Sequence, residues 1–427
     1  MTELSTDIII QGCQPISGTI QAGGAKNSVL KLMAAAILAA GQTHITNVPD
    51  ISDVQTMAEV LRQLGVAVTL EQSALTIDTS TVTSYVAPPE LVNQMRASIA
   101  VLGPLLGRFH QAQVAVPGGC KIGERQLDLH FSALEALGMQ YHTDTVYIHA
   151  SAPQGLKGAP VNLSFPSVGA TENLMMAAVL AEGETVIDNA AREPEIVDLA
   201  DYLVAMGAQI KGAGTPQIRI IGVRQLKPVA EYQTIGDRIV SGTFLVAGAL
   251  LGGPLTVEGI KPAHLAAALD KLISMGVTVQ AKENSITVFR ERPLIPQNIQ
   301  TLPFPGFPTD LQPQFMVLDC LAKGQALVAE NIFENRFQHV RELQQMGAHI
   351  KTQGHFATVE GVEQLQGAIV QSSDLRGGAA LVLAGLVAKG QTRVTNTEHI
   401  DRGYERLTEK LSALGATLTR AGWRTAG

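Results

Sequence analysis

Residues 169–211 of the chain, GATENLMMAAVLAEGETVIDNAAREPEIVDLADYLVAMGAQIK, contain the pattern that decides its fold. Gly169–Ala181 is apolar and rich in Ala and Met, which predicts a buried helix, and Thr185–Asn189 alternates like a strand. Glu195–Met206 has apolar residues near helical spacing, and Gly207 predicts the end of this second helix. Because helix and strand alternate, the stretch indicates an α/β unit with parallel crossovers.

Two further strands, Ala208–Lys211 and Gln217–Ile221, complete this unit, and the unit recurs along the chain. In each copy, one glycine ends the second helix and another ends the first helix. The glycines after the second helix are Gly65, Gly138, Gly207, Gly276, Gly347 and Gly415, and those after the first are Gly41, Gly107, Gly183, Gly252, Gly324 and Gly390. Two landmarks in phase indicate six copies of one unit. Residues that the scaffold needs recur in every copy, whereas residues that chemistry needs occur once.

The length of 427 residues exceeds what one core usually supports, so we expect two domains of three units. One closed ring of six units is the alternative. Residues 223–235 contain Pro228 and lack periodicity, which makes them the candidate linker between units three and four. The net charge of -7 argues against a nucleic-acid surface. Any anionic ligand must therefore be held by a local cluster of cations.

The three cysteines leave no even framework for disulfides, and no signal peptide or membrane-spanning run is visible, so we expect a cytoplasmic protein. Cys13 and Cys320 lie in apolar segments and are expected to be buried. Cys120 lies in a Gly-rich polar loop beside Lys121 and near Arg125, where cations favour the thiolate. We therefore expect Cys120 to be reactive.

Cations occur where several first helices are expected to begin. These residues are Lys26, Arg96, Arg238 and Arg376. Helix starts favour anions and Lys or Arg make poor caps, so a bound anion is the simplest explanation. For Asp237 an ordinary N-cap is an equally good interpretation. There is no Walker loop, metal-ligand spacing or nucleophile elbow, so no metal or cofactor is expected. The pattern suits a small, multiply charged anion such as a phosphorylated carboxylate.

These unusual residues resemble the motifs of the enolpyruvyl transferases, and the resemblance covers essentially the whole chain. The matching segments are Gly24–Asn27, Met95–Ser98, Pro117–Arg125 with Asp128–His130, Ser167–Thr171, Phe307–Asp310, Glu334–Phe337, Asp374–Arg376 and His399–Glu405. The family fold is an inside-out α/β barrel of two domains, each of three repeated βα units. In that family the N-terminal strand belongs to the second domain. The resemblance thus implies one domain of residues 1–22 and 236–427, and another of residues 23–235 that carries the Cys120 lid.

The resemblance implies transfer of the enolpyruvyl group of phosphoenolpyruvate to the 3-hydroxyl of UDP-N-acetylglucosamine, the first committed step of peptidoglycan synthesis. Phosphate leaves through a tetrahedral intermediate, and no cofactor is needed. Asp310 resembles the carboxylate that accepts or positions the hydroxyl proton, and Cys120 resembles the lid thiol that acts as an acid and is alkylated by fosfomycin. Lys26, Arg125 and Arg402 match the phosphate clamp, and Arg336 and Arg376 match contacts to the carboxylate. The residues matched to the nucleotide sugar and its cleft are Asn27, Arg96, Ser167, Val168, Gly169, Ile332 and Asp374.

Two alternatives remain at this stage. The shikimate-pathway enolpyruvyl transferase shares the chemistry but uses shikimate 3-phosphate and lacks a lid with a cysteine. A non-catalytic paralogue that binds the UDP-sugar could lose Asp310 or Cys120 without unfolding, yet both are present. One departure concerns the diphosphate. Phe165 and Pro166 stand where some family members have a lysine that contacts it.

Overall fold

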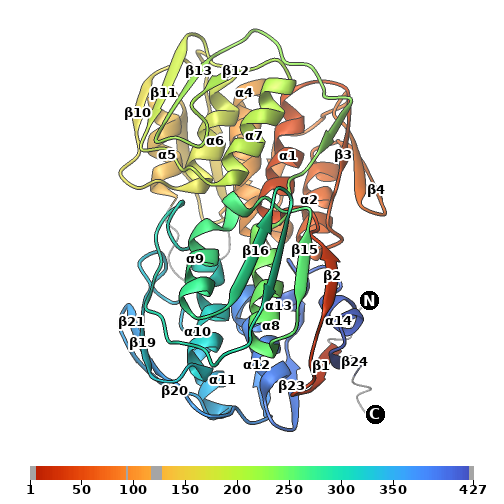
Figure 1. The fold of residues 1–427 in the computed structure, drawn as a ribbon. Helices are drawn as coiled ribbons and strands as arrows, with labels where there is room; N and C mark the ends of the chain where they lie inside the picture. Colours follow the sequence, from red (N-terminus) through yellow and green to blue (C-terminus); the bar gives the residue numbers. More distant parts are fainter. Residues whose placement is uncertain (1–5, 93–94, 117–126, 423–427) are drawn as a thin grey trace. The chain divides into compact units, whose positions relative to one another are not determined.

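The computed structural model describes residues 6–92, 95–116 and 127–422, and these form two compact units. The first unit comprises the described residues between Gly24 and Ile235, and the second comprises those up to Gly23 and from Gly236 onward (Figure 1). Each unit has its own hydrophobic core. Within the described residues, no helix is long and apolar enough to cross a bilayer.

The first unit contains elements α1–α7 and β3–β14. Its strands are β3 (Gln42–Thr46), β4 (Ala67–Glu71), β5 (Ala74–Asp78), β6 (Val86–Ala87), β7 (Gln111–Ala115), β8 (Gln140–Thr143), β9 (Tyr147–Ser151), β10 (Pro160–Asn162), β11 (Glu184–Asp188), β12 (Gln209–Lys211), β13 (Gln217–Ile221) and β14 (Glu231–Gln233). Its helices are α1 (Lys26–Ala35), α2 (Ser52–Gln63), α3 (Pro89–Val92), α4 (Leu102–Phe109), α5 (Asp128–Ala136), α6 (Val168–Ala178) and α7 (Pro194–Ala205), with 3₁₀ turns η1 (Ala36–Leu38) and η2 (Arg96–Val101).

The second unit contains β1, β2 and all elements from α8 onward. Its strands are β1 (Thr6–Gln11), β2 (Gly18–Gln21), β15 (Leu255–Glu258), β16 (Thr278–Lys282), β17 (Ser285–Phe289), β18 (Ile299–Gln300), β19 (Gln325–Ala329), β20 (His349–Gln353), β21 (Phe356–Glu360), β22 (Ile369–Gln371), β23 (Gln391–Thr395) and β24 (Thr417–Gly422). Its helices are α8 (Arg238–Leu251), α9 (Ala266–Ser274), α10 (Gln312–Leu321), α11 (Val340–Gln345), α12 (Leu375–Val387), α13 (Glu398–Asp401) and α14 (Leu407–Ala413), with 3₁₀ turns η3 (Pro262–Leu265) and η4 (Thr309–Leu311).

The third repeat shows how each unit is built. Helix α6 links β10 to β11, which pair in parallel with Val161 opposite Ile187. Helix α7 then leads to the hairpin of β12 and β13, and β13 inserts antiparallel between β11 and β12. The parallel crossovers expected from the sequence are therefore confirmed for the helix-linked strands, and an antiparallel hairpin completes the sheet. The same four-stranded order recurs in six sheets of the described chain.

Three repeats contain strands from distant parts of the sequence. Strand β14 pairs in parallel with β3, so it supplies the first strand of repeat one. Residues 223–235 lie between repeats three and four, but they also contain β14, which was not predicted because a strand of three residues is too short to show a period. In the second unit, β1 lies between β23 and β24, and β2 pairs with β15. The N-terminal strands thus fill the sheets of repeats six and four.

Glycine ends the second helix of every repeat in a left-handed conformation, with φ between +86° at Gly65 and +107° at Gly415. Glycine adopts this conformation without the steric cost that a Cβ would add. The second series behaves alike except in repeat two. There Gly107 lies inside α4, and His110, with φ of +57°, ends the helix instead. Gly107 lets α4 lie close to α6, since an added Cβ would lie 3.3 Å from the Met176 carbonyl oxygen.

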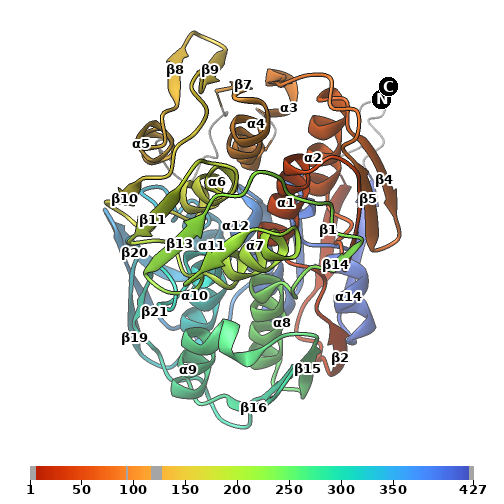
Figure 2. The same ribbon diagram turned by 90° about the horizontal axis from the view of Figure 1, so that it is seen from above.

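The helices lie inside and the sheets outside in both units. Nearly every residue of α6, α8 and α12 is buried, whereas strands such as β11 and β13 alternate between buried and exposed residues. A helix that is apolar on all sides belongs in a core, and an alternating strand has one face in water. Figures 1 and 2 show the strands of each unit around its inner helices, which confirms the inside-out α/β barrel.

Candidate active site

Helices α8, α10 and α12 pack against one another in the second unit, and polar residues gather where they begin. Asp237 caps α8 by accepting hydrogen bonds from the backbone N–H groups of Ile239 (2.8 Å) and Val240 (2.9 Å). Asp374 caps α12 by accepting from Arg376 (2.9 Å) and Gly377 (3.1 Å). The N-cap interpretation of Asp237 is therefore confirmed, and Asp374 plays the same structural part.

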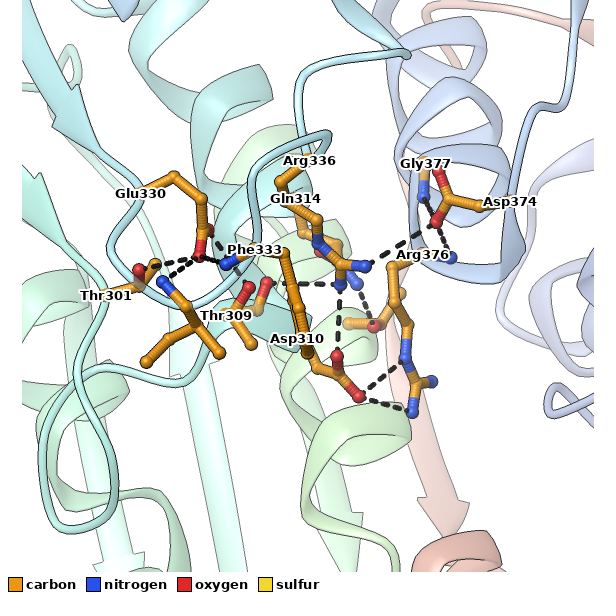
Figure 3. A network of polar contacts seen from close by, with 12 residues as sticks. Thr301, Thr309, Asp310, Gln314, Glu330, Phe333, Arg336, Asp374, Arg376 and Gly377 are labelled. Carbon is orange, nitrogen blue, oxygen red and sulfur yellow. Dashed lines mark hydrogen bonds and ion pairs between the residues drawn. The ribbon is translucent and has the colours of Figure 1, made fainter. Parts of the chain in front are cut away.

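Asp310, in the turn η4 before α10, lies between two arginines (Figure 3). Its Oδ1 accepts a hydrogen bond from Arg336 Nη2 at 3.0 Å. Its Oδ2 accepts from Arg376 Nε at 3.2 Å and lies 3.1 Å from Arg376 Nη2. The side chain of Asp310 is 25% exposed, whereas those of Arg336 and Arg376 are 2% and 4% exposed. The carboxylate thus neutralises two buried cations at the edge of the core.

Both guanidinium groups keep one nitrogen without a hydrogen-bond partner. These buried atoms are Arg336 Nε and Arg376 Nη1. The Arg336 guanidinium lies 5.9 Å from the ring centre of Phe333, and that of Arg376 lies 5.4 Å from that of Tyr404. Burial alone would lower the pKa of Arg376, but the carboxylate of Asp310 raises it above its usual value. Arg376 therefore stays charged and has a donor to offer an anion.

Asp374 and His339 surround the other side of Arg336. The Oδ1 atom of Asp374 lies 3.8 Å from Arg336 Nη1. Burial opposes the ionisation of Asp374, yet Arg336 and the backbone N–H of Gly377 lower its pKa below the usual value. Burial also lowers the pKa of His339 to about 4. At neutral pH the charges of the two aspartates therefore balance those of Arg336 and Arg376, and His339 is neutral.

Hydrogen bonds with Thr243 and Gln314 hold Tyr404, whose ring lies against the Arg376 guanidinium. The Tyr404 hydroxyl lies 2.9 Å from Thr243 Oγ1, and the Gln314 amide lies 3.2 Å from both oxygens. Thr243 and Gln314 come from α8 and α10. Sequence analysis did not identify these residues, although a signal existed, since each is a polar residue within an apolar inner helix.

Lys26 begins α1 in the first unit, as expected, and forms a buried ion pair with Asp53 at 2.6 Å. One turn further, Lys31 pairs with Glu172 at 2.9 Å. Burial raises the pKa of Glu172 to about 7, although Lys31 partly opposes this shift. Carboxylates of the protein therefore partner the cations of this helix, as Asp310 partners Arg376. A cation at a helix start therefore does not by itself require a bound anion, because a carboxylate of the same repeat, such as Asp53, or of another repeat, such as Asp310, can neutralise it.

The Ser167–Gly169 turn begins α6. Ser167 accepts a hydrogen bond from the Ala170 N–H at 3.3 Å, and Val168 and Gly169 open the helix half-buried. A Cβ on Gly169 would lie 3.0 Å from the His130 ring, so this glycine allows close approach of the imidazole. His130 in turn lies 3.0 Å from the Asn173 amide. The turn expected to bind substrate therefore packs against the buried pair of His130 and Asn173.

The remaining expected residues lie on separate elements of the two units. Asn27 is half-buried in the first turn of α1, and Arg96 is the first residue of η2. Ile332 donates its N–H to the Glu330 carboxylate at 2.9 Å. Arg402 follows α13, whose last residue, Asp401, pairs with Arg420. The expected lid residues Cys120, Lys121 and Arg125 lie outside the described residues. No cluster of His, Cys, Asp or Glu suited to a metal ion occurs in the part of the chain that the structure describes.

The two described cysteines differ. Cys320 is buried within α10, as expected. The prediction of a buried Cys13 was wrong, because the residue is exposed with φ of +62° just after β1. Its thiol lies 3.4 Å from the carbonyl oxygens of Val387 and Ala388, which face it from the end of α12. The apolar run Ile8–Ile10 ends before Gln11 and Gly12, so the buried pattern of β1 does not extend to Cys13.

Comparison with known proteins gives consistent results. Residues 10–411 match the family of EPSP synthase (3-phosphoshikimate 1-carboxyvinyltransferase). The chain is 50% identical over 414 residues to UDP-N-acetylglucosamine 1-carboxyvinyltransferase 2 of Carboxydothermus hydrogenoformans, covering 96% of this chain and 98% of that protein. It is 51% identical over 426 residues to UDP-N-acetylglucosamine 1-carboxyvinyltransferase of Nocardia farcinica, covering 98% and 99%.

Solved structures show the same architecture. The enolpyruvyl transferase NikO from Streptomyces tendae superposes with a TM-score of 0.88 at 25% identity, over 98% of this chain and all of that one. The EPSP synthase of Acinetobacter baumannii gives a TM-score of 0.77 at 19% identity, over 98% of this chain and all of the other. The latter likeness shows the fold alone.

Proposed function

The chain belongs to the EPSP synthase family of enolpyruvyl transferases, and from this premise we propose that it transfers the enolpyruvyl group of phosphoenolpyruvate to UDP-N-acetylglucosamine. The observation that carries the choice of acceptor is identity of about half over nearly the whole chain to relatives named for that sugar nucleotide. Shikimate 3-phosphate is the weaker candidate, because the likeness to EPSP synthase structures is limited to the fold. The reaction serves peptidoglycan synthesis, and we assign it to the cytoplasm.

The chemistry is an addition followed by an elimination. The 3-hydroxyl oxygen of the sugar bonds to C2 of phosphoenolpyruvate, its proton passes to a base, and C3 gains a proton. The resulting tetrahedral intermediate then loses a proton from C3 as the bond from C2 to the phosphate oxygen breaks. Such a sequence needs a base, an acid and cations for phosphate and carboxylate. We assign the base to Asp310, and the acid to Cys120.

The contacts of Asp310 support its assignment. Arg336 and Arg376 keep it ionised, so it can accept or orient the hydroxyl proton. It is also the most exposed member of the group, which leaves it open to an incoming hydroxyl. The same cations are suited to meet the substrate carboxylate, so we infer that this carboxylate takes over part of the charge that Asp310 neutralises in the structure.

Arg336 and Arg376 are suited to bind that carboxylate. Each is fixed by packing on an aromatic ring, and each has a buried N–H group without a partner. An unsatisfied buried donor costs about 1–3 kcal/mol, which an anion would recover. Planar guanidinium groups also match the geometry of a carboxylate better than an ammonium does. Asp374 holds Arg336 from the opposite side and caps the helix that carries Arg376.

The other assignments are carried over from the family resemblance. We assign phosphate binding to Lys26, Arg125 and Arg402; the Lys26 ammonium lies at a helix start, where backbone N–H groups also favour anions. Nucleotide-sugar binding is assigned to six residues that the family resemblance matched to that substrate. They are Asn27, Arg96, Ser167, Val168, Gly169 and Ile332. No cofactor is required.

The test is to incubate the chain with phosphoenolpyruvate and either UDP-N-acetylglucosamine or shikimate 3-phosphate, and to identify the product by mass spectrometry. We expect an enolpyruvyl ether of the sugar nucleotide only. Product from shikimate 3-phosphate alone would reassign the acceptor. Binding of the sugar nucleotide without any product would favour the regulatory paralogue.

A further inference from the structure

Glu330 follows β19 and is 1% exposed. Its Oε1 accepts hydrogen bonds from Thr301 Oγ1 (2.9 Å) and from the backbone N–H groups of Ile332 (2.9 Å) and Phe333 (3.1 Å). Its Oε2 accepts from Thr309 Oγ1 at 3.0 Å. Figure 3 shows this carboxylate beside the loop that carries Asp310. One buried side chain therefore holds three separate pieces of backbone.

Two of these pieces lead directly to the ion-pair cluster. Thr309 precedes Asp310, and Phe333 lies three residues before Arg336. Arg336 Nη2 closes the arrangement by donating to the Thr309 carbonyl oxygen at 3.2 Å and to Asp310 Oδ1 at 3.0 Å. A shift of the Glu330 carboxylate would therefore move the base and one of its guanidinium partners relative to each other.

The scaffold does not need this carboxylate. In repeats one and three, an asparagine with positive φ follows the second strand and donates its amide to a carbonyl oxygen just after the first strand. These contacts are Asn47 to Thr234 at 2.8 Å and Asn189 to Leu163 at 2.7 Å. In repeat five Glu330 itself stands at the position of these asparagines, directly after the second strand, and Asn331, one residue further along, donates to the corresponding carbonyl oxygen of Thr301 at 3.1 Å. The asparagine contact is thus kept in repeat five, and the bonds to the Glu330 carboxylate are additional to it.

Burying a carboxylate at a position with only a structural role is also energetically unfavourable. No Lys, Arg or His side chain among the described residues forms an ion pair with Glu330. Burying a carboxylate without a cation costs several kcal/mol unless hydrogen bonds compensate. Here four donors do so, and bonds to an ionised acceptor are shorter and stronger than neutral ones. A charged acceptor fixes the Thr309 hydroxyl as a donor, which a neutral amide would not.

We propose that Glu330 is a positioning residue for the transfer reaction, which sets Asp310 and Arg336 relative to each other through Thr309 and the backbone of Ile332 and Phe333. This inference rests on the proposed function. Glu330 does not touch the reacting atoms. Its effect is on the placement of the base, and so on kcat.

The test compares Glu330→Gln, Thr309→Val and the double variant with the wild-type chain. Glutamine can keep the three bonds to Oε1 but places an N–H group against the Thr309 hydroxyl. We expect kcat to fall about tenfold to a hundredfold in each single variant, as a displacement of about 1 Å can cause. The loss in kcat should exceed any rise in KM, and the melting temperature should change little. The double variant should be no slower than the slower single variant, because both changes break one link.

Glu360→Gln is the matched control, since Glu360 is an exposed glutamate at the end of β21 in the same repeat. Wild-type kcat in Glu330→Gln or Thr309→Val, or multiplicative losses in the double variant, would overturn the inference. If Glu330→Gln does not fold, Thr309→Val decides alone. A wild-type chain without turnover would instead refute the proposed function itself.

Discussion

Replacing Asp310 by asparagine removes a negative charge that pairs with both Arg336 and Arg376. With an effective dielectric constant near 20, each close pair represents roughly 4 kcal/mol of gross attraction. Removing one partner of a buried ion pair typically costs about 3–5 kcal/mol. Asp310 is 25% exposed, so water screens it, and Arg336 keeps Asp374 at 3.8 Å. We therefore expect the second unit to lose about 2–3 kcal/mol of stability.

Thermal unfolding followed by calorimetry measures this loss. A destabilisation of this size corresponds to a fall of about 4–10 °C for a unit of this length. The variant should also gain more stability than the wild type from added phosphate, because an anion can replace the missing carboxylate between the guanidinium groups. Asp270→Asn is the control, since Asp270 is an exposed aspartate on α9 in the same unit.

An Asp310→Asn variant as stable as the wild type, with no added response to phosphate, would refute this reasoning. Such a result would mean that the two arginines do not depend on Asp310 for neutralisation. The proposed exchange between Asp310 and a substrate carboxylate would then lose its basis.

Three further outcomes are expected. Burial raises the pKa of Asp319 to about 7, so this carboxyl group destabilises the fold progressively as the pH rises from about 4 to 7. Asp319→Asn should therefore exceed the wild type in free energy of unfolding by about 3 kcal/mol more at pH 8 than at pH 5, and an equal difference at both pH values would contradict this. Gly65→Ala should destabilise the protein more than Gly207→Ala in urea unfolding. Both glycines have positive φ, but of the two only Gly65 has neighbouring atoms that an added Cβ would overlap, so equal losses would disprove the packing argument. Fosfomycin should alkylate Cys120 and leave Cys13 unmodified in peptide mass mapping; an unmodified Cys120 would remove the ground for its assignment as the acid.

Much of the fold follows from the sequence because each repeat carries local signals. The segments Gln217–Ile221 and Glu195–Met206 were predicted within a residue of β13 and α7. What local patterns could not show was the exchange of strands between distant segments. Strands β14, β1 and β2 complete sheets whose other members lie far away in sequence. Pairing of this kind depends on long-range packing, and a strand of three or four residues carries too little periodicity to reveal it.

The site residues could be predicted where a residue occurs once and does not recur in every repeat. Asp310, Arg336, Asp374 and Arg376 were identified as candidates from resemblance, and the structure brings these four together. The supporting residues were not identified, because their roles depend on contacts that local sequence patterns do not show. Glu330 is an example, since its partners are the hydroxyls of Thr301 and Thr309 and the backbone of Ile332 and Phe333.

The most direct test of the account measures phosphate release from phosphoenolpyruvate by the wild-type chain and by Asp310→Asn, each with and without UDP-N-acetylglucosamine. The account predicts release by the wild type only when the sugar nucleotide is present, and a loss of at least about a hundredfold in the variant, as expected for a base that acts in the transition state. Release that does not require the sugar nucleotide, or wild-type rates in Asp310→Asn, would contradict it.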